Sequence, residues 1–273
     1  MPMIIKGSMK KYNWNAKDYA KNSKPQQQWA RELIAKLNLK GTEDILDLGC
    51  GDGKITAEMA RDVPCGSAVG VDNSISMIKL ASERYPIDEY PNLAFILMDA
   101  SRLSFIELFD VAFSNAALHW VKNQKPLLNG LHRSLKLGGK ILLQMGGKGN
   151  AEQILSLLEK LQSKKEWRPY FRGFEFPYRF FGAEEYTQLL KEAGFDVHRV
   201  ELIPKDMEHE GQSGFEAWIR TVWHPYTERV PEEKRDMFIR ALSKEYINQV
   251  PVDSTGKVHV AMVRLEVEAG KHS

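Results

Sequence analysis

The segment "ILDLGCGDG", residues 45–53, joins an apolar run to three closely spaced glycines. The glycines are Gly49, Gly51 and Gly53, and the apolar run contains one acid, Asp47. Glycine allows a tight turn and lets a ligand approach the backbone, because it has no Cβ. At the carboxyl end of a strand in a parallel sheet, such a turn is a typical place for a cofactor.

Two cofactor classes compete for this turn. Dinucleotide-binding turns follow G-x-G-x-x-G, which would need a glycine at the position of Lys54. Asp47 stands before the first glycine, where a carboxylate suits a cation better than a pyrophosphate. S-adenosylmethionine carries an ammonium and a sulfonium group and no phosphate, so the pattern D-x-G-x-G-x-G favours it over NAD. Cys50 lies inside the turn as a small residue, and we assign its thiol no nucleophilic role.

Asp72 ends the next expected strand, "VGVDNS", 23 residues after Gly49. This is close to the offset of roughly 20 residues expected of an acid that binds ribose hydroxyls. The alternative is that Asp72 caps the following helix. Asn73 or Ser74 could take that capping role instead and leave Asp72 for a ligand.

The third and fourth strands also end in polar or small residues. Asp99, in "LMDAS", is placed to accept from an adenine amino group, with the Ala100 amide beside it. Asn115, in "FSNAALHW", would line the methionine side of the cofactor. Matching residues at four strand ends indicate a cofactor site more strongly than the glycines alone.

Strand and helix patterns alternate from about residue 25 to residue 146, which is typical of a parallel sheet with helices on both faces. They include a helix over 125–136 that ends at Gly138 and, later, a strand over 196–203. The segment "GKVHVAMVRLEVEAG" alternates as an edge or antiparallel strand. We expect a lead-in segment (1–24), a cofactor-binding α/β core (25–146, 181–204 and 255–268) and a mostly helical substrate-binding lid (147–180 and 205–254).

Four segments, "ILDLGCGDG", "GVDNS", "FILMDAS" and "FDVAFSNAALHWV", resemble the successive cofactor motifs of class I S-adenosylmethionine-dependent methyltransferases. Over nearly the whole chain, "WNAKDY", "SNAALHWV", "FEFPYRFFGAEEYTQLLKEAGF" and "AWIRTVWHPYTERVPEEKRDMF" are similar to the trans-aconitate 2-methyltransferase group. The resemblance implies a Rossmann-like, seven-stranded, mostly parallel sheet whose last strand is antiparallel. It also implies S-adenosylmethionine as cofactor and S-adenosylhomocysteine as product. Other small-molecule carboxyl methyltransferases share this layout, so the acceptor stays open.

The resemblance carries cofactor contacts to residues at or just after the strand ends. Met77 would pack on the adenine, or would instead be a core residue of an amphipathic helix. The expected cofactor-binding residues are Asp47, Gly49, Cys50, Gly51, Asp72, Asn73, Met77, Asp99, Ala100 and Asn115.

Methyl transfer from a sulfonium is an in-line displacement that mainly requires alignment and a site closed to water. A carboxylate acceptor is already ionised and needs a cationic clamp rather than a base. For a phenol or amine acceptor, His119 is the candidate catalytic base; its alternative role is an imidazole tied to the backbone. Each lid arginine, taken alone, is more often a solvated surface residue. The expected substrate-binding residues are Trp120, Arg168, Tyr170, Arg172, Arg220 and His224.

Composition excludes several other classes. The net charge of +2 is too small for a concentrated nucleic-acid-binding face, and no stretch is apolar enough for a membrane span. The two cysteines, Cys50 and Cys65, have no metal-ligand spacing, so we expect no metal and a reduced, cytoplasmic setting. We expect a monomer or homodimer acting on a small-molecule acid. The rivals are an NAD-dependent oxidoreductase, a methyltransferase of RNA or protein, and a non-catalytic binding module.

Overall fold

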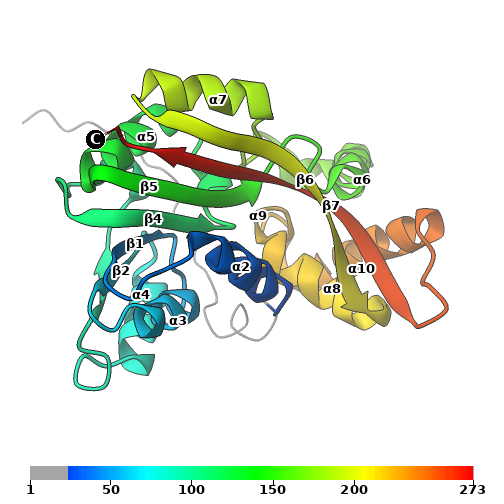
Figure 1. Cartoon of the computed structure of the whole chain (residues 1–273). Coiled ribbons are helices and arrows are strands. Elements are labelled where there is room, and N and C mark those ends of the chain that lie inside the picture. The colour runs from blue at the N-terminus through cyan, green and yellow to red at the C-terminus, as the bar shows by residue number, and fades with distance from the viewer. Residues whose placement is uncertain (1–23, 273) are drawn as a thin grey trace, which may run out of the picture.

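A computed structural model describes residues 24–272 of the chain (Figure 1). Apart from Lys24, the expected lead-in segment (1–24) therefore lies outside the described residues. Among the described helices, none has the length and apolar character that crossing a membrane requires.

The strands form one seven-stranded sheet in the order β3-β2-β1-β4-β5-β7-β6. Strand β7 runs antiparallel to both its neighbours, and the other six strands run parallel, as predicted. The strand order reverses between β1 and β4, which is where open parallel sheets bind ligands. The bounds are β1 Asp44–Leu48, β2 Ser67–Asp72, β3 Leu93–Leu97, β4 Phe109–Asn115, β5 Leu135–Gly146, β6 Asp196–Glu210 and β7 Lys257–Gly270.

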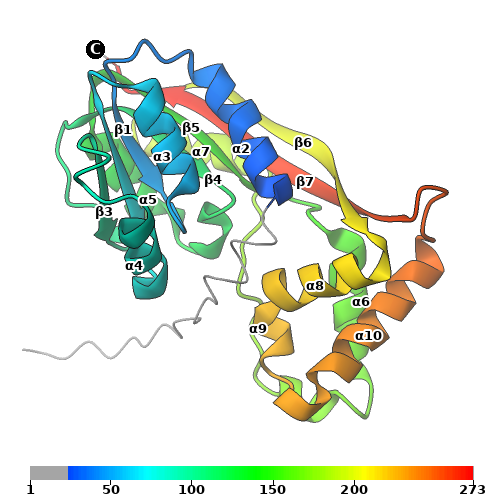
Figure 2. The same cartoon turned by 90° about the horizontal axis from the view of Figure 1, so that it is seen from below.

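Helices cover both faces of the sheet, which confirms the α/β prediction (Figures 1 and 2). One face carries α2, α3 and α4, and the other carries α5 and α7. Each face has its own apolar core, with Leu33 and Met59 in one and Leu131 and Leu190 in the other. The bounds are α2 Lys24–Leu37, α3 Lys54–Asp62, α4 Ile75–Arg84, α5 Gln124–Ser134 and α7 Ala183–Glu192.

A helical layer packs under the far ends of β6 and β7, beside the sheet domain (Figure 2). It comprises α6 Glu152–Ser163, η3 Arg168–Phe171, α8 Gly211–Val222, α9 His224–Thr227 and α10 Glu232–Gln249. Its side chains share one buried cluster, which Met207 of β6 and Val260 of β7 join from the strands.

Two predicted boundaries differ from the structure. Strand β6 does not stop at residue 203 but continues to Glu210, because Met207 and His209 alternate inward and face the helical layer's core. Helix α5 ends at Ser134, earlier than predicted, because buried Leu135 already pairs with Phe109 of β4.

Glu266 of β7 is buried and ties four elements together. It accepts hydrogen bonds from Lys36 of α2 (2.5 Å), Arg199 of β6 (2.5 Å) and the Gln144 amide of β5 (3.0 Å). A carboxylate that accepts two charge-assisted hydrogen bonds and one amide hydrogen bond is well compensated for its loss of hydration. This network fixes α2 and β6 against the carboxyl end of β5.

We predict that Glu266→Ala lowers the free energy of unfolding by about 2 kcal/mol, since Lys36 and Arg199 are left without their shared anion but can regain some water. Urea unfolding measures the loss. Glu268→Ala is the matched control, because Glu268 meets Arg199 at 3.6 Å on the exposed side, where such a pair contributes less than about 1 kcal/mol. Equal losses in the two variants would contradict this role.

Candidate active site

The glycine turn after β1 is fastened to the end of β2. The amides of Gly49 and Cys50 both donate to the Val71 carbonyl, at 2.8 and 3.1 Å. Gly49 and Gly53 have backbone φ angles of +72° and +79°, which residues other than glycine rarely adopt. A Cβ on Gly49 would lie 2.2 Å from the Ala117 Cβ, so packing as well as backbone conformation requires glycine there.

Gly51 differs from its two neighbours in the motif. Its φ is +54°, yet a Cβ built on it would meet no atom within 4 Å. Conformation requires glycine here, while the space above the residue is open. A ligand can therefore approach the Gly51 backbone closely, as expected of a cofactor-binding turn.

Two acids lie beside this turn. Asp47 is 2 % exposed and accepts a 2.6 Å hydrogen bond from the Thr56 hydroxyl. Burial, together with the nearby charge of Asp72, raises the pKa of Asp47 to about 7, although the Thr56 bond opposes the shift. Burial also raises the pKa of the Cys50 thiol, so this residue stays protonated and suits no nucleophilic role. A cation bound beside Asp47 would favour its ionised form.

Asp72 organises the turn rather than capping the next helix. Its two oxygens accept from the Gly51 amide (3.0 Å) and the Ser74 amide (2.8 Å). Ser74, not Asp72, is the N-cap of α4 and accepts from the Met77 amide. Asp72 thus meets the turn directly and retains lone pairs for ribose hydroxyls, while Asn73 is exposed beside it.

The ends of β3 and β4 complete this edge of the sheet. Asp99 caps the short helix η1 (Ala100–Arg102) by accepting from the Ser101 amide and hydroxyl through one oxygen. After Asn115, Ala116 has φ +59°, an unfavourable conformation held by its 2.8 Å bond to the Gln144 carbonyl. Backbone strain of this kind is common at binding sites.

Of the proposed adenine contacts, Met77 is the least accessible. It is 3 % exposed on α4, which suits a core residue better than a ligand contact. Ile75 and Leu97 were not predicted, yet both are exposed apolar side chains, and Leu97 is the cross-strand partner of Asp72. We propose that they flank the adenine, because exposed apolar side chains beside a ribose-binding acid suit an aromatic base.

His119 lies in η2 (Leu118–Trp120), just past β4, and reaches the end of β5. Its Nδ1 accepts from the Gly146 amide over a long 3.4 Å. Burial, followed by the charge of Arg264, lowers the pKa of His119 to about 3. The ring is therefore neutral at physiological pH, and with Nδ1 as acceptor its proton sits on Nε2.

Aromatic rings from the helical layer surround His119. Trp120 stacks on His224 of α9 with ring centroids 5.6 Å apart, and meets Tyr178 edge-on at 4.5 Å. Tyr178 and Phe180 lie 5.5 and 5.9 Å from the His119 ring. The structure thus brings three predicted residues, His119, Trp120 and His224, into one cluster at the junction of sheet and helical layer.

The remaining predicted substrate residues point elsewhere. Arg220 is exposed and pairs with Asp236 at 2.8 Å. The Tyr170 hydroxyl accepts from the exposed Lys234 at 3.0 Å. Arg168 and Arg172 are exposed beside η3, where solvated arginines need no ligand. The structure does not join these four residues to the His119 cluster.

Sequence reasoning missed Arg264, Tyr178 and Phe180. Arg264 is 4 % exposed and lies on the same face of β7 as the buried Val260 and Met262. The available signal was a charged residue that follows three apolar residues, Val258, Val260 and Met262, at alternate positions of the strand. The two aromatic residues stood in a segment that was predicted to be irregular, so nothing local indicated which rings turn inward.

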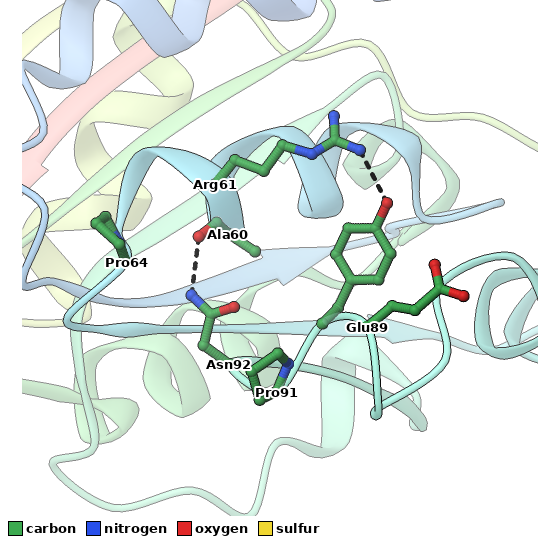
Figure 3. A pocket seen from close by; sticks show the side chains of 7 residues that line it. Ala60, Arg61, Pro64, Glu89, Pro91 and Asn92 are labelled. Carbon is green, nitrogen blue, oxygen red and sulfur yellow. Dashed lines mark hydrogen bonds between the residues drawn. The ribbon is translucent and has the colours of Figure 1, made fainter.

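A cavity of about 500 Å³ lies at the amino ends of β2 and β3, opposite the edge described above (Figure 3). Its polar groups already bond within the protein: Arg61 donates to the Tyr90 hydroxyl at 2.9 Å, and Asn92 donates to the Ala60 and Val63 carbonyls. We assign this cavity no part in the site.

Another titratable cluster lies on the β6–β7 ladder. His259 bonds Asp206 through Nδ1 (2.6 Å) and Asp253 through Nε2 (3.0 Å), and Glu208 is close by. Bonds to Asp253 and Asp206 raise the pKa of His259 to about 8, so a proton already balances the carboxylates. We interpret this cluster as fastening the ladder.

Known proteins share this sequence and fold. Residues 46–143 match the family model described as "Methyltransferase domain". An uncharacterized methyltransferase of Schizosaccharomyces pombe is 36% identical over 204 residues, covering 70% of this chain and 74% of that protein. A trans-aconitate 2-methyltransferase of Enterobacter sp. is 27% identical over 256 residues, covering 93% of this chain and 96% of that protein.

A solved structure shares the fold at lower identity. Phosphoethanolamine N-methyltransferase 2 of Haemonchus contortus, in complex with phosphomonomethylethanolamine and S-adenosylhomocysteine, superposes with a TM-score of 0.60 at 18% identity. The match covers 94% of this chain and 57% of that chain. The space above Gly51, the buried Asp47 and the half-buried Asp72 fit an adenosyl cofactor of this kind.

We predict that Gly51→Ala weakens S-adenosylhomocysteine binding at least about tenfold, because a methyl group would fill the space that the ligand needs. Calorimetry measures the affinity. The control is Gly138→Ala, since Gly138 also has a positive φ (+75°) and open space around it but lies at the other end of the sheet. Both variants should lose about 1 kcal/mol of stability; unchanged affinity in Gly51→Ala would refute the assignment.

We also predict that affinity for S-adenosylhomocysteine rises with pH through about 7 and levels off above it. The free protein holds Asp47 protonated below its pKa of about 7, whereas the ligand's ammonium group favours the carboxylate. Calorimetry in buffers of different ionisation enthalpy should detect proton release below pH 7. Asp47→Asn should flatten the profile; a wild-type affinity independent of pH would count against this contact.

Proposed function

Since the chain belongs to the class I S-adenosylmethionine-dependent methyltransferases, we propose that its acceptor is a carboxylate oxygen of a small organic acid. The cofactor is S-adenosylmethionine, and the dinucleotide alternative is wrong. Several relatives are named trans-aconitate 2-methyltransferase, and their matches run over almost the whole chain, which supports an acid acceptor.

The chain's own residues suit this cofactor, which when bound supplies an activated methyl group on a sulfonium. We propose that Asp72 binds the ribose hydroxyls, that Asp99 and the Ala100 amide bind the adenine edge, and that Asp47 and Asn115 face the methionine portion. Gly49 and Gly51 bring the backbone close to the ligand, with Cys50 and Asn73 beside it. The open space above Gly51 and the acids beside it support these assignments.

The protonation state of His119 is the observation that favours a carboxylate acceptor over a phenol or an amine. A base works best when its pKa is near the operating pH, and the pKa of His119 is about 3. Its Nδ1 also already accepts from the Gly146 amide, which leaves Nε2–H as a donor. An imidazole in this state is a poor base for a phenol or an ammonium group. It suits a carboxylate, which arrives ionised and accepts a hydrogen bond.

We propose that the helical layer serves as the substrate-binding lid (147–180 and 205–254). Trp120 contacts Tyr178 and His224 from this layer, so aromatic rings from both parts of the molecule meet beside His119. Closure of this kind excludes water from a sulfonium and holds the nucleophile in line, which can supply several kcal/mol of the barrier reduction. The exposed Arg168, Arg172 and Arg220 are better explained as surface residues.

We predict that, at S-adenosylmethionine concentrations that saturate the protein at every pH, kcat/KM for an acid acceptor stays constant from about pH 6 to about pH 8. Neither His119 nor an ionised carboxylate titrates in that range, and the bound cofactor keeps Asp47 ionised. Methyl transfer from labelled S-adenosylmethionine to a panel of organic acids, phenols and amines measures this profile.

His119→Gln provides the matched test, since the glutamine amide replaces the Nε2–H donor but cannot act as a base. Activity on acids should stay within about tenfold, whereas loss of a required general base costs about 10²–10⁴-fold. Turnover restricted to phenols or amines, with an inflection near pH 6.5 that His119→Gln abolishes, would overturn the proposal.

A further inference from the structure

Thr56 forms a hydrogen bond that leaves its own helix. It lies in the first turn of α3, and its side chain is fully buried. A threonine in a helix can donate to a carbonyl of the preceding turn, but the Thr56 hydroxyl donates to Asp47 Oδ2 at 2.6 Å. Asp47 belongs to β1, so this bond joins the helix after the glycine turn to the strand before it.

Two titratable groups lie close to the Asp47 carboxylate. Asp72, at the end of β2, is a second acid, and its charge adds to burial in raising the pKa of Asp47. The Cys50 thiol, in the turn, stays protonated because burial and the nearby acids raise its pKa. The register partners of Asp47 in β2 and β4 carry no charge.

Asp52, the third acid of this region, has cations beside it. It pairs with Arg84 of α4 at 2.6 Å and with Lys54 of α3 at 3.5 Å. These two cations therefore serve Asp52. The Thr56 hydroxyl, by contrast, acts on Asp47 directly and favours the ionised form of that carboxyl.

The start of α3 holds the hydroxyl in one place. Threonine is branched at Cβ, which restricts rotation about χ1. Gly53 turns the chain into the helix with a φ of +79°, and its carbonyl accepts from the Ala57 amide at 2.9 Å. A carboxylate has about four lone-pair positions, so the bond from Thr56 leaves Asp47 able to accept from a ligand as well.

We propose that Thr56 is a positioning residue for cofactor binding, whose hydroxyl holds the Asp47 carboxylate ready for the ammonium group of the cofactor. The inference rests on the proposed contact between Asp47 and the methionine portion of the cofactor. Without the hydroxyl, a buried carboxylate loses a hydrogen bond to its charged form and takes up a proton more readily. Binding would then have to release that proton, so the loss of affinity would depend on pH.

The experiment measures S-adenosylhomocysteine affinity by calorimetry from about pH 6 to about pH 8.5 in wild type, Thr56→Val and Thr56→Ser. Valine keeps the branched shape and loses the hydroxyl. The midpoint of the pH profile should move from about 7 in wild type to about 8 in Thr56→Val, since a hydrogen bond to a charged group can change proton affinity about tenfold. Affinity should fall about tenfold at pH 6 and less than about twofold at pH 8.5. Thr56→Ser keeps the donor and should restore the wild-type midpoint.

Ser114→Ala is the matched control. Ser114 of β4 is also fully buried, and its hydroxyl donates at 2.7 Å to the carbonyl of Leu48, next to Asp47 in β1. The substitution removes a buried hydroxyl bond to the same strand without touching the carboxylate, so the midpoint should stay at about 7. In an Asp47→Asn background, Thr56→Val should add no pH-dependent loss, because the titrating group is gone.

The outcomes separate this inference from the contact on which it rests. An unchanged midpoint in Thr56→Val, or a loss of affinity equal at pH 6 and pH 8.5, overturns the role of Thr56 while the Asp47 contact stands. If wild-type affinity is independent of pH and Asp47→Asn binds equally well, the Asp47 contact fails and the inference with it. If Thr56→Val does not fold, Thr56→Ala removes the same hydroxyl with a smaller side chain and decides by the same criteria.

Discussion

The contact on which the rest of the site depends is the junction between the glycine turn and the end of β2. The Val71 carbonyl accepts from Gly49 and Cys50, and the next residue, Asp72, accepts from Gly51. These bonds hold a left-handed turn open above Gly51 and bring a carboxylate to its side. The parallel sheet makes this possible, because it brings the carboxyl ends of β1, β2 and β4 to one edge, where the strand order reverses.

Much of the fold could be predicted from sequence, because alternating apolar runs and glycine or proline breaks are local signals. The antiparallel last strand followed from the resemblance and from the alternation in 256–270. The length of β6 could not be predicted, because residues 205–210 are all polar except Met207, and they form a strand only by pairing with β7. The predicted end of α5 was wrong for the same reason. Leu135 belongs to strand β5 and not to the helix, because it pairs with Phe109 of β4.

The cofactor side and the acceptor side of the site differ in how well the sequence predicts their residues. The proposed cofactor side consists of short motifs at strand ends, so Asp47, Gly51 and Asp72 could be proposed from their spacing. The acceptor side is assembled by tertiary packing of distant segments. The lid arginines were predicted to bind substrate because they stand beside aromatic residues in the sequence. Arg264 was not, because the alternating pattern around it indicated only a strand. Burial, which sequence does not give, distinguishes the two groups.

A neutral histidine among aromatic rings supports the proposal that the acceptor is anionic on arrival. The direct test is the chemical identity of the product made from S-adenosylmethionine and an organic acid, determined by mass spectrometry before and after treatment with mild base. The account predicts a methyl ester that base hydrolyses to methanol and the original acid. A base-stable methyl ether or N-methyl product would contradict it.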